Sequence, residues 1–276
     1  MSLMLKLLIA VVLLNSFAYA NTSEKIEDFI SEQLDKNPSL KSVDVNVKSV
    51  VKLDQPKGWN AYIVQIEAVL KSKPPKTIRQ KMIWFSDGNV ITKDLTDMQT
   101  GESLIQRVKP DFKSKYYTKA NLIYGNENAK HKIAIFSDPL CPFCKAYVPG
   151  ALEDMKKEPN KFAVYYFHFP LVRLHPASVT LVKAAVVAEN MGIKDLILKL
   201  YNVKVKSNER DAKKILAAFN KAVGTKITLK ELNSAQVKKK TKFDLDVAND
   251  MMVGGTPTVY LDGKIDRTKK KYKKVK

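Results

Sequence analysis

Residues 132–144, KIAIFSDPLCPFC, join a short apolar strand to a Cys-x-x-Cys motif that opens a helical pattern. Disulfide exchange needs one thiolate that attacks a disulfide and a second thiol that resolves the mixed disulfide. At a helix N-terminus, unpaired backbone N–H groups and the helix dipole favour the thiolate form of the first cysteine. Pro142 suits the first turn, where its missing N–H has no partner. The motif predicts Cys141 as nucleophile and Cys144 as resolving thiol, with Cys141 exposed.

These two cysteines are the only ones among the 276 residues. A bridge between them closes too short a loop to staple a fold effectively. A four-thiolate zinc site within one chain is excluded, and covalent haem attachment needs a histidine where Lys145 stands. A zinc half-site completed by another chain and an inert bridge stay open as alternatives. We expect no metal and no cofactor other than the redox-active Cys141–Cys144 pair.

A second motif lies near the C-terminus, where Gly254-Gly255-Thr256-Pro257-Thr258 precedes the apolar strand Val259-Tyr260-Leu261. A proline that opens a strand after glycines is a candidate for a cis peptide bond; an ordinary turn proline is the alternative. Asp262-Gly263 then forms a hairpin turn. A strand, a Cys-x-x-Cys motif, a helix and a late Thr-Pro before a hairpin strand is the order of elements in a thioredoxin fold.

The chain resembles the periplasmic Dsb thiol–disulfide interchange proteins, and most of all their DsbC/DsbG branch. Phe136-Ser137-Asp138-Pro139 before the cysteines and Gly255-Thr256-Pro257-Thr258 before the strand carry this resemblance over residues 120–265. It implies that Pro257 is in cis, and that Thr256 is of the type found in the isomerase/reductase branch. It also implies that client proteins contact Pro142, Phe143, Thr256 and Pro257.

The first twenty residues have the pattern of a cleavable secretory signal. Lys6 is followed by the apolar run Leu7–Leu14, and Ala18-Tyr19-Ala20 provides small residues before a cleavage site. The alternative is a membrane anchor, but the run is shorter than the ~20 residues needed to span a bilayer. The sequence therefore predicts export to the periplasm and a mature chain beginning near Asn21.

The mature chain is predicted to form an α+β or α/β protein of two domains. Residues 21–93 show a helical pattern over 23–34 and then a meander of alternating strands. Residues 94–114 form a linker, and 115–276 form a thioredoxin-like domain with a helical insertion. In that domain we expect a strand over 162–169, mostly helix over 175–221, and a kink or break of the active-site helix at Pro149-Gly150. By resemblance, residues 21–93 are a cystatin-like dimerisation domain.

The charge and composition limit which partners the sequence predicts. The net charge is +20, with a dense lysine run over 264–276. No nucleic-acid-binding motif is visible, and nucleic acid is not expected as a partner. The content of 45% hydrophobic and 28% charged residues is typical of a soluble globular protein.

These patterns and the resemblance together predict a homodimeric oxidoreductase that reduces or isomerises disulfides in exported, cysteine-containing client proteins. A membrane electron donor of the DsbD type would keep it reduced. Two alternatives stay open. One is a DsbA-like dithiol oxidase with a DsbB-type partner, and the other is a holdase-type chaperone that uses the dimer cleft. The two redox readings need the same active site and differ in redox poise.

Overall fold

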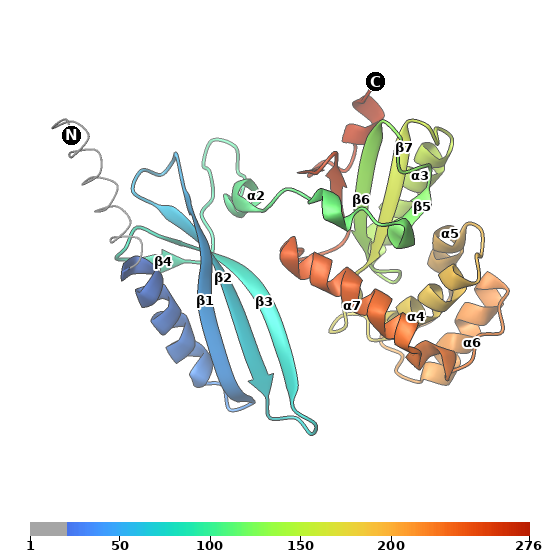
Figure 1. The fold of residues 1–276 in the computed structure, drawn as a ribbon, viewed down its shortest axis with the longest axis horizontal. Helices are drawn as coiled ribbons and strands as arrows, with labels where there is room; N and C mark the ends of the chain where they lie inside the picture. Colours follow the sequence, from blue (N-terminus) through green and yellow to red (C-terminus); the bar gives the residue numbers. More distant parts are fainter. Residues whose placement is uncertain (1–20) are drawn as a thin grey trace, which may run out of the picture. The chain divides into compact units, whose positions relative to one another are not determined.

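A computed structural model describes residues 21–276, and the expected signal sequence, residues 1–20, lies outside them (Figure 1). The chain divides into two compact units between Lys109 and Pro110. We call the described residues up to Lys109 unit 1, and residues 110–276 unit 2. Within residues 21–276, no helix has both the length and the apolar character needed to cross a membrane.

Unit 1 is an antiparallel sheet with one helix on it. Residues 21–35 are helical, and the strand order is β1-β2-β3-β4. The strands are β1 (Leu40–Lys52), β2 (Asn60–Leu70), β3 (Lys76–Ser86) and β4 (Ile91–Thr92). The predicted helix and meander are thus present, and a short helix α2 (Ile105–Val108) lies in the segment predicted as linker.

The core of unit 1 forms between this helix and one face of the sheet. Ile26 and Ile30 of the helix are buried against a cluster of strand residues that includes Tyr62. Ile26 and Ile30, four residues apart, define the line of contact. Phe29 lies beside that line and is 40% exposed.

Unit 2 is built on a five-stranded mixed sheet of order β5-β7-β6-β8-β9. The strands are β5 (Leu122–Tyr124), β6 (His131–Ser137), β7 (Phe162–His168), β8 (Thr258–Leu261) and β9 (Lys264–Ile265). β6 and β7 run parallel and are joined through a helix, whereas the other neighbours are antiparallel. This is the strand-helix-strand unit predicted around the Cys-x-x-Cys motif.

Five helices surround this sheet: α3 (Pro142–Lys156), α4 (Ala177–Asn190), α5 (Leu196–Tyr201), α6 (Ala212–Val223) and α7 (Ala235–Asp250). The predicted helical stretch over 175–221 is divided into three. Gly192 and Asp195 adopt positive φ values of 70° and 55° between α4 and α5. Asp211 then begins α6 by accepting hydrogen bonds from the N–H groups of Lys213 and Lys214.

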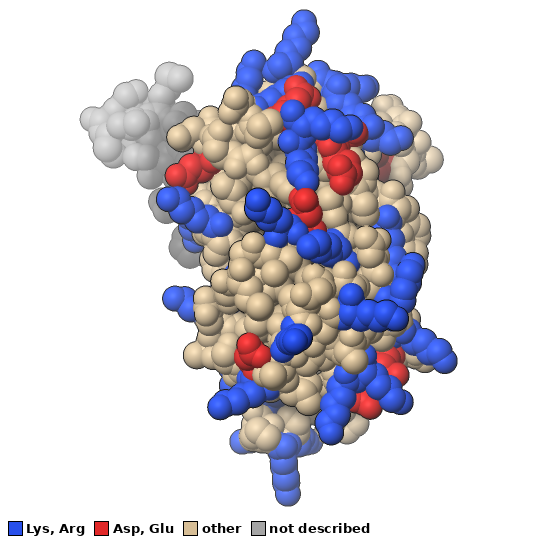
Figure 2. Space-filling view, turned by 90° about the vertical axis from the view of Figure 1, so that its right-hand side faces the viewer, with Lys and Arg blue, Asp and Glu red and all other residues tan. Residues whose placement is uncertain are grey.

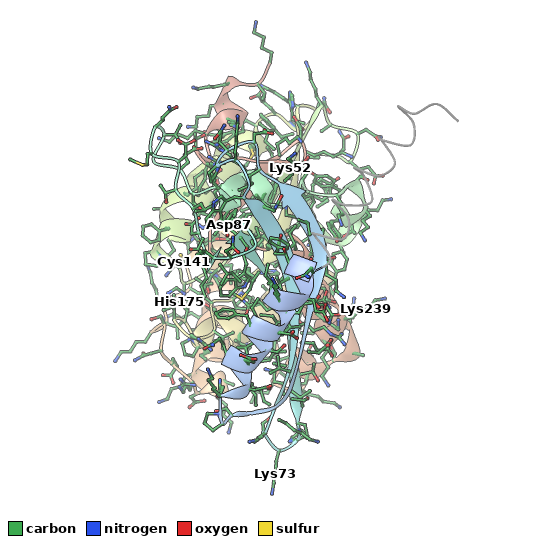
Figure 3. All side chains as sticks on the ribbon, turned by 90° about the vertical axis from the view of Figure 1, so that its left-hand side faces the viewer. Lys52, Lys73, Asp87, Cys141, His175 and Lys239 are labelled. Carbon is green, nitrogen blue, oxygen red and sulfur yellow. The ribbon has the colours of Figure 1, made fainter. Side chains whose placement is uncertain are left out.

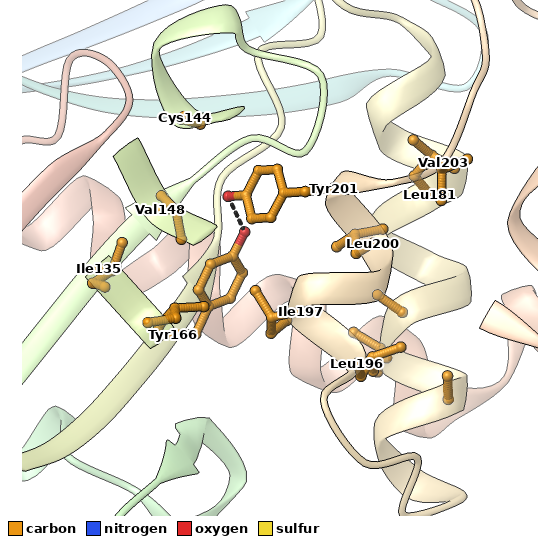
Figure 4. Close-up of a cluster of buried hydrophobic side chains, with 14 of the residues drawn as sticks. Ile135, Cys144, Val148, Tyr166, Leu181, Leu196, Ile197, Leu200, Tyr201 and Val203 are labelled. Carbon is orange, nitrogen blue, oxygen red and sulfur yellow. Dashed lines mark hydrogen bonds between the residues drawn. The ribbon is translucent and has the colours of Figure 1, made fainter. Parts of the chain in front are cut away.

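Both faces of the unit 2 sheet are buried, which explains why its central strands are nearly continuous apolar runs. On β6, Ile133 and Ile135 face a large core with residues of α3 to α6. Ala134 and Phe136 face a second core with residues of α7. The larger core extends up to the resolving cysteine (Figure 4).

Of the predicted kink or break at Pro149, the break was wrong, because α3 runs without interruption from Pro142 to Lys156. The proline removes one backbone hydrogen bond from the helix interior. On either side of it, Val148, Ala151 and Leu152 are buried in the larger core. Tertiary packing of this apolar face therefore overrides the local tendency to break.

Candidate active site

The Cys-x-x-Cys motif lies where β6 ends and α3 begins. Cys141 is the N-cap residue of α3, with extended backbone angles, and Pro142 is the first helical residue. The Lys145 N–H donates to the Cys141 carbonyl over 3.0 Å, which closes the first turn. The predicted position of the motif at a helix N-terminus is therefore confirmed.

The three side chains of the motif differ sharply in exposure. Cys144 is fully buried and Phe143 is 75% exposed, whereas Cys141 is only 3% exposed. The expectation of an exposed Cys141 was wrong, because this residue packs with Leu140 at the rim of the larger core. Both cysteines are free thiols.

The late Thr-Pro motif lies against the first cysteine. The Thr256–Pro257 peptide bond is cis, as predicted. The Cys141 thiol donates to the Thr256 carbonyl, with 3.6 Å between sulfur and oxygen. Thus Cys141, Thr256 and Pro257 lie together, although 115 positions separate Cys141 from Thr256 along the chain.

Cys144 lies deeper, above a buried chain of hydroxyl groups. Burial raises the pKa of the Cys144 thiol to about 11, and the nearby Ser137 and Thr256 hydroxyl groups only partly oppose this rise. Ser137 Oγ is 2.6 Å from the Tyr201 hydroxyl, which is 2.9 Å from the Tyr166 hydroxyl (Figure 4). The Cys144 thiol is therefore held in its protonated form in a low-dielectric environment beside hydroxyl groups.

Asp138 organises the loop that carries the motif, a role that the sequence analysis did not predict. Its side chain is fully buried. It accepts hydrogen bonds from four groups: the N–H groups of Leu140, Cys141 and Leu171, and the Ser178 hydroxyl. An acidic residue between an apolar strand and a proline was the available signal, since a buried carboxylate requires such partners.

The same carboxylate ties a second loop, residues 169–176, to the active site. Leu171 N–H donates to Asp138 Oδ2 over 2.6 Å, and His175 Nδ1 lies 3.3 Å from the same oxygen. Two apolar side chains of this loop, Val172 and Leu174, are 55% and 68% exposed. Phe143, in the first turn of α3, is likewise apolar and exposed, and we call these three residues the apolar rim.

This arrangement can carry out dithiol chemistry. One thiol lies at a helix N-terminus and the other is buried one turn later, the geometry that formation and resolution of a mixed disulfide require. Among residues 21–276, no cluster of three or more His, Cys, Asp or Glu side chains is placed to hold a metal ion.

Comparisons with known proteins agree with this geometry. The family model described as Thioredoxin matches residues 117–276, more than half of the chain. A probable disulfide bond formation protein D from Bacillus anthracis is 25% identical over 162 residues, covering 54% of this chain and 72% of that protein. A protein of the same name from Bacillus cereus is also 25% identical over 162 residues, covering 54% of this chain and 73% of that protein.

Solved structures of similar proteins include BdbD and ScsC. BdbD from Bacillus subtilis has a TM-score of 0.44 and 19% identity, covering 60% of this chain and 90% of that one. ScsC from Proteus mirabilis, in a compact conformation, has a TM-score of 0.46 and 21% identity, covering 56% and 73%. These matches do not separate the DsbC/DsbG branch from the other Dsb proteins. Together with the active-site geometry, the family match means that the chain belongs to the thioredoxin family, and is similar within it to the Dsb disulfide oxidoreductases.

Proposed function

We propose that this protein is a periplasmic oxidoreductase that reduces and isomerises wrongly paired disulfides in exported proteins. Thiol–disulfide interchange follows from a Cys-x-x-Cys motif at the start of α3 in a thioredoxin-family domain. The observation that carries the proposal is the contrast between the two thiols. Cys141 lies at the helix N-terminus beside the Thr256 carbonyl, and Cys144 is buried with a raised pKa.

The reaction begins when the Cys141 thiolate attacks one sulfur of a client disulfide. The bond between Cys141 Sγ and that sulfur forms as the client disulfide breaks, and the other client sulfur leaves as a thiolate that takes up a proton. The backbone N–H groups at the start of α3 and the helix dipole stabilise the attacking thiolate. The Thr256 carbonyl is 3.6 Å from Cys141 Sγ, so a client chain at this sulfur also meets the backbone of the Thr256–Pro257 segment.

The mixed disulfide can then follow two routes. In reduction, the Cys144 thiol loses its proton and attacks Cys141 Sγ, which releases the second client thiol and leaves a Cys141–Cys144 disulfide. In isomerisation, the freed client thiolate attacks another client disulfide, and a client thiol finally displaces Cys141, with no net oxidation. Because burial raises the pKa of Cys144 to about 11, resolution is delayed and the client has time to rearrange.

Polypeptide clients fit the surroundings of the motif. The three residues of the apolar rim are each more than half exposed. Unfolded chains expose apolar side chains, and such segments gain free energy by covering this surface. A holdase-type activity would use the same surface without the thiols.

A dithiol oxidase is the second candidate, because the two Bacillus relatives are named probable disulfide bond formation proteins. An oxidase would receive the disulfide from a DsbB-type membrane partner and pass it to clients. The isomerase would instead be kept reduced by a DsbD-type donor. Thr256 before the cis proline supports the isomerase, through the resemblance to that branch.

The test uses the chain from residue 21, its Cys141→Ser variant and its Cys144→Ala variant. The parent protein should reactivate scrambled ribonuclease and reduce insulin, Cys141→Ser should do neither, and Cys144→Ala should accumulate mixed disulfides with exported proteins. The thiols should be mainly reduced in the periplasm. A pair that is mainly oxidised there would establish the oxidase instead. Unchanged client folding with Cys141→Ser would favour the holdase.

Assembly and location are parts of the same proposal. By resemblance, unit 1 would join two copies, so that two active sites face a shared cleft. Sizing chromatography of residues 21–276 should give a dimer, whereas residues 110–276 should give a monomer. Fractionation of cells should place the protein in the periplasm, with an N-terminus at Asn21.

A further inference from the structure

Unit 2 contains a cavity of about 940 Å³ that the redox chemistry does not use. It lies at the edge strand β5, between residues that follow α4 and residues of α7. Lys156, the last residue of α3, lines it, whereas Cys141 precedes the first residue of that helix. The 15 residues of α3 separate the two ends by roughly 22 Å, at about 1.5 Å per residue. Figure 3 likewise shows Cys141 and the cavity residue Lys239 on opposite sides of unit 2.

The charged side chains that line the cavity are mostly lysines from distant parts of the sequence. They are Lys119, Lys156, Lys194, Lys239 and Lys240, together with the acidic residues Glu189 and Asp195. Both acids already have partners inside the protein. Glu189 is 2.9 Å from His168 Nε2, and Asp195 accepts hydrogen bonds from Lys156 and the Tyr124 hydroxyl.

Three of the lysines keep their charge largely available. Among residues 21–276, Lys194 and Lys239 form no ion pair, and Lys119 has only a loose contact of 3.8 Å with Glu127. Lys240, in contrast, is bound to the buried carboxylate of Asp244. The cavity therefore presents an excess of positive charge to whatever occupies it.

Positive charge alone does not single out this place, because lysine and arginine side chains are spread over a whole face of the molecule (Figure 2). The cavity is distinguished by the combination of this charge with an apolar lining. Six large apolar residues line the cavity: Leu122, Ile123, Ile193, Leu196, Ile197 and Phe243. A concave site of this size, mostly apolar and with a few charged groups, is typical of small-ligand sites.

We propose that this cavity binds a monoanionic amphiphile, a fatty-acid-type carboxylate with an extended acyl chain. The acyl chain would cover the apolar lining, and the carboxylate would lie among Lys119, Lys194 and Lys239. A cation of the same shape would be repelled by these lysines, and an uncharged ester would leave their charge unmatched. This site is independent of the proposed redox function, because no cavity residue belongs to the active site.

The test is titration calorimetry of sodium oleate, below its aggregation concentration, into residues 21–276. The charge-reversed variant carries Lys194→Glu and Lys239→Glu. The matched control carries Lys270→Glu and Lys274→Glu, exposed lysines outside the cavity that give the same change in net charge. A blocking variant, Ala120→Trp, fills the cavity from its exposed edge.

Oleate should saturate a single site in the parent protein and in the matched control. The charge-reversed variant should bind about tenfold more weakly or worse, since two attractive charges become repulsive. The blocking variant should lose binding, and methyl oleate should bind more weakly than oleate. Equal oleate affinity in the parent and charge-reversed proteins, or no saturable binding by the parent, would overturn the proposal.

The proposed redox function and the proposed oleate site can be tested independently of each other. Cys141→Ser should bind oleate like the parent protein, although its disulfide exchange is lost. The charge-reversed variant should reduce insulin at the parent rate. Loss of oleate binding by Cys141→Ser would place the ligand at the thiols and would also overturn the cavity site.

Discussion

Units 1 and 2 differ in where they bury polar side chains. Within residues 21–276, unit 1 buries one such side chain, Ser86. Unit 2 buries seven: Asn121, Ser137, Asp138, His168, Ser178, Asp244 and Asp266. A buried polar group costs free energy unless it is hydrogen-bonded. These groups are concentrated in unit 2, and three of them lie around the cysteines. There, hydrogen-bonded polar side chains hold the active-site loop in place of a wholly apolar core.

Two aspartates make the contrast concrete. Asp87 in unit 1 (labelled in Figure 3) lies exposed in a turn and accepts hydrogen bonds from the N–H groups of Asn89 and Val90, which lower the pKa of this carboxyl. Asp138 in unit 2 also accepts main-chain N–H groups but is fully buried. Water can replace the first carboxylate and cannot reach the second. Loss of the carboxylate should therefore cost more unfolding free energy at Asp138 than at Asp87.

The largest expected effect is that of Asp138→Ala. Removal of the carboxylate leaves the N–H groups of Leu140 and Leu171 and the Ser178 hydroxyl without their acceptor, whereas the Cys141 N–H keeps the Asp138 carbonyl. Hydrogen bonds to charged groups contribute about 1.5–3 kcal/mol each, so unit 2 should lose roughly 4 kcal/mol or more of unfolding free energy. Urea unfolding followed by near-ultraviolet circular dichroism measures this loss, and insulin reduction should fall with it.

Asp87→Ala is the matched control for this change. It removes a carboxylate that also accepts two N–H groups, but these groups can turn to water. Its effect on urea unfolding should be small, and insulin reduction should stay at the parent rate. Equal destabilisation by the two substitutions would contradict the distinction drawn between the units.

Features set by local sequence could be predicted well. The start of α3 follows from Cys141-Pro142, and the longer strands of both units follow from their alternating or continuous apolar patterns, whereas the short strand β5 was not predicted. A proline that opens a strand after glycines made Pro257 a candidate for a cis bond, and the resemblance to the Dsb proteins implied it. In each case the residues that decide the structure are neighbours along the chain, so a single sequence carries the signal.

Features set by distant contacts could not be predicted. The partners of Asp138 include Leu171 and Ser178, 33 and 40 positions away. The burial of Cys141 depends in part on Thr256, which comes from the far end of the domain. The cavity lysines come from four separate segments, and no spacing along the chain brings them together. At Pro149 a local signal was misleading, since packing of its neighbours keeps α3 continuous in spite of the proline.

One glycine in each unit allows the two units to be compared through a smaller expected loss of stability. Gly125 in unit 2 has φ +75°, and a Cβ there would lie 1.8 Å from the Phe162 carbonyl oxygen. Gly101 in unit 1 has φ +70°, with no atom within 4 Å of such a Cβ. Gly101→Ala should cost only the left-handed backbone penalty of about 1 kcal/mol. Gly125→Ala must in addition displace β7, for a total of about 3 kcal/mol.

Thermal unfolding of both alanine variants measures this difference. The Gly125 variant should show the larger drop in the midpoint temperature of unit 2, and the Gly101 variant a smaller drop confined to unit 1. Equal shifts would mean that the approach of residue 125 to β7 is not as close as described.

The smallest effect concerns pH and isolates the buried thiol. Burial raises the pKa of Cys144 from its ordinary 9.0 to about 11. Below pH 9 this thiol is protonated in both the folded and unfolded chain, so its contribution to stability is fully present. Between pH 9 and 11 only the unfolded chain releases the proton, and the free energy of unfolding should fall by about 2–3 kcal/mol. The comparison is between Cys141→Ser and the Cys141→Ser, Cys144→Ser double variant, in which tyrosine ionisation contributes equally and cancels. Their unfolding free energies should converge as pH rises from 9 to 11, whereas parallel curves would show that Cys144 ionises as readily in the folded unit as in the unfolded chain.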